Sequence, residues 1–498
     1  YSSSYNPNDN QSTSEPQELS IPSSNINAVQ FQQRPMYSSS YNPMHERRNK
    51  AIQAIYQFLH EEGLQQTLKQ LQDETRIAYD REALTEFGVL LQSLDIREAY
   101  ISAQCKSSSN TQSFLQILKA NSKLDEKPCV NLLYQFHGIH KSNILCVSVF
   151  YHNNTMHLIS GVATRSLQVV SCRDIFNRTA CKPDDYDVEE NDAKECQSRI
   201  VSEMNGLAGP PLYIDVDPEY QRYALVTCMD GSIYVIDLHS TVTSPMDWKF
   251  VLHQDHRKYV TIGRWSTSSR YLLTAGHDNK STLYKFEQTK AVKTDESESG
   301  GDDDDVFTVR KLHQYEYGAC VEAIAWVSSD EFIISVRNSN FLEYYKIDET
   351  LDTKVKADDG SYSYLQPYLK CNLNAFGDNH VSFCIGDIHL SGDGKFILVK
   401  TDHEKVFLMI ARSEETLKTY FGSHSDLYSY TRCAFGRGDK YVYASHHNDY
   451  VVWDVLSAKL IFRQSNAHKK TLRDLCVDKK HGVIVTASFD RCIKIWAP

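Results

Sequence analysis

Hydrophobic and polar residues alternate at the end of the chain, residues 466–498, in a pattern that predicts three short β-strands. Apolar residues recur in runs at 472–477, 483–488 and 493–496. The second run is rich in β-branched residues and the third alternates with a period of two, and both features favour strands over helices. This stretch therefore predicts a small antiparallel sheet joined by tight turns.

Four polar or aromatic side chains of the same stretch fall where a WD40 repeat has its hydrogen-bonded tetrad, so the stretch resembles one blade of a WD40 β-propeller. The resemblance implies that an imidazole is held by a turn carboxylate, a strand hydroxyl and an indole N–H, which gives each buried polar group a partner. The implied tetrad is His468, Ser488, Asp490 and Trp496. A blade has four strands and this stretch supplies three, so its outermost strand must come from elsewhere.

An apolar run at Cys129–Gly138, directly after Pro128, is the natural donor of that missing strand. Pairing the two ends of the repeat region would close the ring and remove exposed strand edges.

Aligning the tight turns predicts seven blades. The turns from His403 to Asp490 are spaced close to the roughly 40–45 residues expected of this repeat. The predicted blades are 140–170, 212–238, 256–286, 313–347, 381–410, 423–455 and 466–498, and acidic insertions at 181–205 and 290–305 interrupt them. Dense like charge keeps a loop solvated, so we interpret the insertions as solvated loops; a docking tail for a basic partner is the alternative.

The chain before the repeats divides into three parts. Residues 1–44 are rich in Ser, Asn and Gln and are expected to be disordered. Residues 45–80 have apolar positions at helical spacing on both sides of Gly63, which predicts a helical hairpin. Residues 81–127 are expected to hold short helices and a linker.

The hairpin resembles a LisH motif through Ile55, Tyr56, Phe58, Leu59, Gly63, Thr67, Leu71 and Glu74. The resemblance implies homodimerisation, and a hairpin of this size cannot build an adequate core alone. The alternative is a hairpin that packs against the propeller of its own chain. The expected dimerisation residues are Ile52, Ile55, Tyr56, Leu59, Leu64, Leu68 and Leu71.

The expected fold is therefore mainly β: a seven-bladed WD40 β-propeller over residues 128–498, with an N-terminal α-helical, LisH-like region and a disordered tail. The net charge of −11 argues against a nucleic-acid partner, and no apolar run is long enough to span a membrane. The 13 scattered cysteines favour a reducing compartment, the cytoplasm or the nucleus.

Catalytic constellations are not evident in the sequence, so we expect an interaction protein with no catalytic residues, no cofactor, no metal and no small-molecule substrate. His446, His447 and Asp449 are interpreted as a blade turn rather than a metal site. Resemblance to WD40 repeats implies that two positions per blade face the mouth of the ring. The candidate partner-binding residues are Thr261, Glu322, Thr431 and Arg473 in first strands, and Met229, His277, Asn338, Asp402, His446 and Phe489 before the turns.

The favoured function is a scaffold, dimeric through its N-terminal helices, that binds protein or peptide partners as a subunit of a larger complex. One alternative is a substrate receptor or structural subunit of a ubiquitin ligase. Leu456 stands where such receptors often carry a basic residue, which weakens this alternative. A propeller enzyme is the alternative from another class.

Overall fold

The computed structural model describes residues 52–53, 55–56, 59–60, 65–78, 127–177, 190–289, 306–347, 366–374, 381, 383–423 and 432–498. The chain divides into two compact units, Tyr1–Arg97 and Glu98–Pro498, and each is described by itself. The tail expected to be disordered, residues 1–44, lies outside the described residues. Among the helices that the structure does describe, none is long and apolar enough to cross a membrane.

The first unit is helical where it is described. The described residues between 52 and 60 are helical, and α2 spans Gln65–Thr75. A small buried cluster joins the two segments through Tyr56, Leu59 and Leu68. The predicted hairpin thus has apolar contacts between its two segments, while the turn expected at Gly63 lies outside the described residues.

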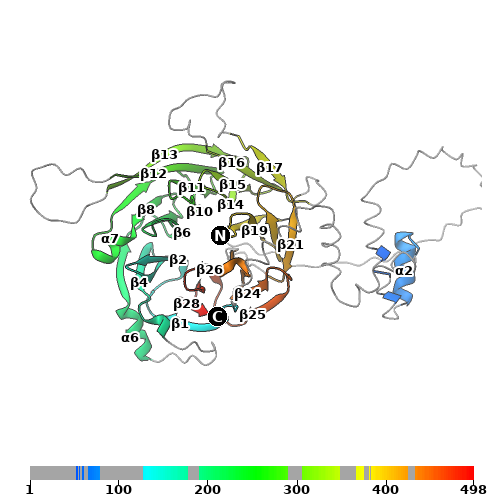
Figure 1. Cartoon of the computed structure of the whole chain (residues 1–498), viewed down its shortest axis with the longest axis horizontal. Coiled ribbons are helices and arrows are strands. Elements are labelled where there is room, and N and C mark those ends of the chain that lie inside the picture. Colours follow the sequence, from blue (N-terminus) through cyan, green and yellow to red (C-terminus); the bar gives the residue numbers. More distant parts are fainter. Residues whose placement is uncertain are drawn as a thin grey trace, which may run out of the picture. The chain divides into compact units, whose positions relative to one another are not determined.

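The described strands of the second unit form seven four-stranded sheets arranged as the blades of a ring (Figure 1). Counted from the hub outward, blade one is β2 Ile144–His152, β3 Thr155–Val162, β4 Ser166–Ser171 and β5 Ile200–Asn205, and blade two is β6 Pro211–Val216, β7 Tyr223–Cys228, β8 Ile233–Asp237 and β9 Phe250–His253. Blade three is β10 Val260–Trp265, β11 Tyr271–Gly276, β12 Lys280–Thr289 and β13 Val306–Glu316, and blade four is β14 Val321–Trp326, β15 Glu331–Val336, β16 Phe341–Lys346 and β17 Leu369–Asn372. Blade five is β18 Ile385–Leu390, β19 Phe396–Thr401, β20 Lys405–Ile410 and β21 Thr416–Phe421, and blade six is β22 Cys433–Phe435, β23 Tyr441–His446, β24 Asp449–Asp454 and β25 Leu460–Gln464. Blade seven is β26 Leu472–Asp478, β27 Val483–Ser488, β28 Ile493–Ala497 and β1 Asn131–Phe136.

The ring is closed by strand β1, which completes blade seven. It pairs antiparallel with β28, so that Asn131 lies opposite Ala497 and Phe136 opposite Ile493. The innermost strands of successive blades contact one another around the hub, and β26 of blade seven contacts β2 of blade one. This confirms the prediction that the apolar run after Pro128 donates the missing strand.

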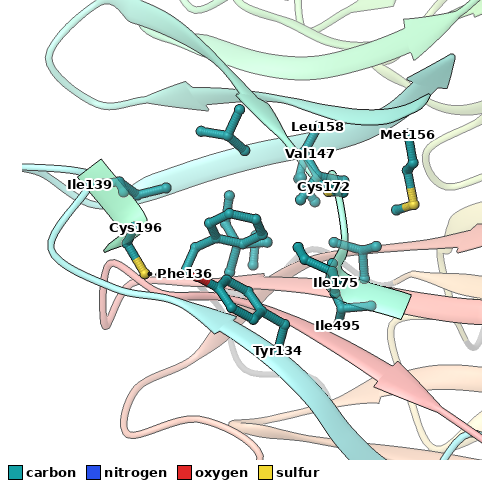
Figure 2. Packing of buried hydrophobic residues seen from close by; sticks show 14 of the residues in the cluster. Tyr134, Phe136, Ile139, Val147, Met156, Leu158, Cys172, Ile175, Cys196 and Ile495 are labelled. Carbon is teal, nitrogen blue, oxygen red and sulfur yellow. Dashed lines mark hydrogen bonds between the residues drawn. The ribbon is translucent and has the colours of Figure 1, made fainter. Parts of the chain in front are cut away.

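The seam between the two ends of the repeat region is packed as a hydrophobic core. Figure 2 shows Tyr134 and Phe136 of β1 together with Ile495 of β28 and Cys196. Cys196 comes from helix α6, Glu190–Ser198, and is 1% exposed. The seam is therefore covered from outside the sheet by a helix that sequence periodicity did not predict.

The acidic insertion is shorter than the predicted range 181–205. Helix α6 and the outer strand β5 of blade one both lie inside that range, because Ile200 pairs with Val170 of β4 and the apolar Ile200 and Val201 pack against the blade. A second boundary was also wrong: His313, expected at the start of blade four, lies in β13 of blade three. The insertion at 290–305 lies outside the described residues.

Two kinds of connection share one face of the ring because neighbouring strands of a blade are antiparallel. These are the turns between second and third strands and the connections from one blade to the next. We call this face the turn face.

Candidate functional site: the turn face of the propeller

The four-residue network of blade seven has three of its four predicted members. His468 Nδ1 lies 3.0 Å from Asp490 Oδ2, and His468 Nε2 lies 2.8 Å from Thr486 Oγ1. The indole N–H of Trp496 also donates to Thr486 Oγ1, at 2.8 Å. The strand hydroxyl is therefore Thr486 and not Ser488, whose hydroxyl donates to the carbonyl oxygen of Lys470 at 2.9 Å.

The network keeps its acid ionised. Burial would raise the pKa of Asp490, but the hydrogen bond from His468 and two backbone N–H donors lower it to about 2. Burial also lowers the pKa of His468. The folded pair is therefore a neutral imidazole that donates to a carboxylate, which links the start of blade seven to its second turn.

Blade three carries the same network with a different aromatic residue. His256 Nδ1 lies 3.0 Å from Asp278 Oδ1, and His256 Nε2 lies 2.9 Å from Thr274 Oγ1. Tyr284 replaces the tryptophan, and its hydroxyl donates to Asp255 at 3.0 Å. Blade one retains a shorter version, in which His140 contacts Ser160 at 3.0 Å and burial lowers the histidine pKa to about 4.

Around the hub, three aspartates of innermost strands each accept a backbone N–H from the innermost strand of the next blade. The pairs are Asp215 with Trp265 at 2.8 Å, Asp387 with Cys433 at 3.0 Å and Asp474 with Val147 at 2.9 Å. The last of these crosses the seam from blade seven to blade one. Each carboxylate satisfies a backbone donor of its neighbour, so these aspartates join blades together.

Two arginines, the buried Arg432 and the partly buried Arg264, neutralise these aspartates. Arg432 Nε lies 2.9 Å from Asp474, and Arg264 Nη2 lies 3.1 Å from Asp387. Both guanidinium groups lie over the ring of Tyr213. These groups line a hub cavity of about 170 Å³. Because they are engaged with one another and with the backbone, we assign them a structural role.

The predicted mouth positions of the first strands coincide with β-bulges. Thr261, Glu322 and Arg473 are each the unpaired residue where the register of an innermost strand shifts. A bulge re-aims the side chain that it carries. Thr261 is nevertheless only 4% exposed, and Arg473, at 9%, lies over the ring of Phe489. The fourth predicted position, Thr431, lies outside the described residues.

The candidate turn residues occupy the same place in the turn in four blades and a different place in two. Met229, His277, Asp402 and Phe489 follow the second strands of their blades, and each donates its backbone N–H to the connection before the first strand. In blade four Arg337 makes this bond, to Cys320 at 2.8 Å, and Asn338 lies one residue further into the turn. In blade six His446 is the last residue of β23 and is 3% exposed, so His447 takes the turn position.

Cations on the turn face of blades three and four lie beside carboxylates. Arg337 Nε lies 2.7 Å from Glu322, Lys280 lies 2.6 Å from Glu316, and Lys311 lies 2.9 Å from Asp255. His277 lies 3.9 Å from Glu322 and stacks on Tyr259, a residue that is 37% exposed. This part of the face is a mixture of paired charges and exposed aromatic surface.

The residues predicted to dimerise are mostly used within the helical unit itself. Tyr56, Leu59 and Leu68 are buried, and Ile52 and Leu71 pack against them. Ile55 is 49% exposed, and Leu64 lies outside the described residues. Of the described members of this set, Ile55 is the large apolar side chain that the hairpin leaves most open to a partner.

Two comparisons with known proteins agree with this geometry. The family profile described as WD domain, G-beta repeat matches residues 460–497, which run from β25 to β28. The WD repeat domain-containing protein 83 homolog of Dictyostelium discoideum is 26% identical over 111 residues, a match that spans 21% of this chain and 34% of that relative.

The closed ring of four-stranded blades makes this protein a β-propeller. Blade seven resembles a WD40 repeat both in its His–Asp–Thr–Trp network and in the matched residues 460–497. Propellers built from WD40 repeats generally serve as platforms for protein interaction rather than as enzymes. Within the part of the chain that the structure describes, no three His, Cys, Asp or Glu side chains are grouped as metal ligands.

Proposed function

We propose that this protein is a non-catalytic scaffold that captures protein partners on the turn face of its propeller. The observation that supports this most directly is the exposed apolar and aromatic surface around the mouth. Met229 is 52% exposed and Tyr259 is 37% exposed, on a frame whose blades are joined by buried networks. Large apolar groups on a rigid, otherwise polar face are typical of protein-interaction sites.

Replacing Met229 by Asp together with Tyr259 by Ala tests this proposal. Affinity purification of the tagged full chain should recover a set of partners that the double variant loses. The matched control is Leu460→Asp, because Leu460 is 49% exposed but lies on the outer strand β25. Equal melting temperatures would show that all three proteins are folded. Retention of every partner by the double variant would contradict the turn-face proposal.

We further propose that the N-terminal helical unit pairs with a second copy of the chain. The LisH resemblance and the exposed Ile55 support this proposal. Pairing would double the valency and strengthen weak contacts at each propeller through effective concentration. Light scattering after gel filtration should give a dimer for the natural chain and a monomer for Ile55→Asp. Gln66→Asp, a change at an exposed polar position of α2, should stay dimeric. A monomeric natural chain at micromolar concentration would contradict pairing.

A further inference from the structure

Five exposed cations gather on the turn face where blades seven and one meet. They are Lys141, Arg165, Lys469, Lys470 and Arg491, and we call them the basic quadrant. Lys469 and Lys470 precede β26, and Arg491 lies in the turn before β28. Lys141 lies between β1 and β2, and Arg165 lies in the turn before β4. Because β1 and β28 share a sheet and β26 contacts β2, these connections adjoin one another.

Backbone hydrogen bonds hold the quadrant in place. The N–H of Lys469 donates to Asp490 at 3.0 Å, and the carbonyl oxygen of Lys470 accepts from Ser488 at 2.9 Å. On the blade-one side of the seam, the N–H of Ala163 donates to the carbonyl oxygen of Asn143 at 3.0 Å. This bond joins the connection that carries Lys141 to the turn that carries Arg165. The charged ends of the side chains are therefore displayed on fixed backbone.

Among the residues that the structure describes, the five side chains have no counter-ions of their own. None of them forms an ion pair or a side-chain hydrogen bond with any residue that the structure describes. In the described connections that carry them, the acidic residue is Asp490, which is already engaged by His468 and two backbone N–H groups. The chain as a whole has a net charge of −11, so this positive area does not reflect its composition.

Backbone preference does not account for the two arginines. Arg165 and Arg491 have φ of 61° and 67°, in the left-handed region that most residues avoid. At the equivalent turn positions, blade two has Gly231 and blade three has Asn279, two residue types that adopt this conformation readily. The turns of blades one and seven thus carry a cation where local structure alone favours a small residue.

We propose that the basic quadrant binds an extended peptide segment rich in Asp and Glu from a partner protein, an inference that rests on the proposed turn-face function. Four connections present the cations over a wide area, which suits an extended chain with several carboxylates. Phe489 precedes Arg491 by two residues, and its half-buried ring lies under the guanidinium of Arg473. This ring offers a contact for one apolar residue of that segment. The carboxylates of blades three and four would repel a phosphate backbone that continued across the face.

Blade three supplies a matched control for the experiment. Arg257 and Lys258 follow its network histidine just as Lys469 and Lys470 follow His468, and Arg257 makes the same backbone bond to Asp278 at 3.0 Å. They lie on the side of the face where carboxylates are present. The variants Lys469→Glu/Lys470→Glu and Arg257→Glu/Lys258→Glu therefore change the same charge at equivalent positions.

Fluorescence anisotropy with a short labelled peptide of Asp, Glu and one Phe should show salt-sensitive binding to the full chain. Binding should weaken by at least about tenfold in Lys469→Glu/Lys470→Glu and by less than about twofold in the blade-three variant. A peptide with Asn and Gln in place of the acids should not bind. Melting temperatures should be unchanged, because the structural bonds of these residues come from the backbone.

Three results would overturn the proposal: unchanged peptide binding in Lys469→Glu/Lys470→Glu, equal losses in both variants, or tighter binding of a single-stranded oligonucleotide than of the acidic peptide. The two proposals can fail separately. If Met229→Asp/Tyr259→Ala loses partners while Lys469→Glu/Lys470→Glu still binds the peptide, the turn-face function stands and the basic quadrant does not. If the reverse holds, acidic-peptide binding stands without the turn-face capture site.

Discussion

Blades seven and three contain the same histidine–aspartate–threonine network, yet they are built differently. Blade three is one continuous piece of chain from β10 to β13, whereas blade seven takes its outer strand β1 from the other end of the propeller. The Trp496 indole turns inward to Thr486, and the Tyr284 hydroxyl bonds to Asp255 near the face. The comparison separates two roles: the network fixes a blade locally, and the β1 pairing fixes the ring.

The same two blades differ in the charge of their turn faces. On blade three Lys311 and Lys280 lie beside Asp255 and Glu316, whereas on blade seven the side chains of Lys469 and Lys470 form no ion pair with a described residue. A side of the face that neutralises itself has less to gain from a charged ligand, because a ligand must first compete with its internal pairs. The turn faces of two blades can therefore differ in how much of their charge is already paired.

The largest expected difference between the two blades is a loss of stability at the seam, where β1 completes blade seven. Phe136→Ala in β1 removes a fully buried ring and should lower the free energy of unfolding by about 3–5 kcal/mol. Phe307→Ala, in the outer strand of blade three, should cost less, about 2–3 kcal/mol, because that ring packs at the rim and closes nothing. Urea titrations followed by circular dichroism would measure both. Equal losses would show that β1 is no more important than an ordinary outer strand.

A smaller effect should separate Thr486 from Ser488. Thr486→Val removes the partner of both the His468 imidazole and the Trp496 indole, and should lower stability by about 2 kcal/mol. Ser488→Ala removes bonds to backbone groups near the surface and should cost about 1 kcal/mol. Thr274→Val gives the blade-three reference. A larger loss of stability for Ser488→Ala than for Thr486→Val would show that Ser488, and not Thr486, provides the hydroxyl of the network.

Much of the fold could be predicted because short stretches of the sequence determine its strands and turns. Alternating apolar runs, tight turns and one well-formed repeat near His468 were enough to predict seven blades and the strand that closes the ring. The hydroxyl of the network was missed because Thr486 and Ser488 are two residues apart in one strand and so point to the same side of the sheet. Strand periodicity alone cannot choose between them.

The site could be predicted only in part because its properties arise between blades. Asn338 and His446 were each placed one residue away from the equivalent turn position, since blades four and six lack the aspartate that marks the turn in blades two, three and seven. The basic quadrant joins residues from both ends of the propeller, and the lysine pair before β26 was its clearest signal in the sequence. Helix α6 was missed because its acidic surroundings resemble a solvated loop. Pairing through the LisH-like helices stays a prediction.

The smallest expected effect is a pH dependence of stability, and it brings blade one into the comparison. In blade one His140 contacts the hydroxyl of Ser160, whereas in blade seven His468 also contacts the carboxylate of Asp490. Burial lowers the pKa of His140 to about 4, so the folded protein binds this proton less readily than the unfolded chain. Its contribution to stability is complete above the usual histidine pKa of about 6.5 and is lost as the pH falls towards 4. Between pH 7 and 5.5 the loss should be about 1 kcal/mol.

Two variants divide this pH dependence between the blades. His140→Asn should flatten the stability profile between pH 6.5 and 4, apart from the slope left by other histidines such as His389, whose pKa desolvation lowers to about 3. Asp490→Asn should act lower, because the pKa of Asp490 is held near 2 and its stabilisation is lost only as the pH falls from about 4 towards that value. If His140→Asn left the slope above pH 4 unchanged, the imidazole of blade one would be solvated in the folded state. Blade one would then lack the buried contact with Ser160 that relates it to blades three and seven.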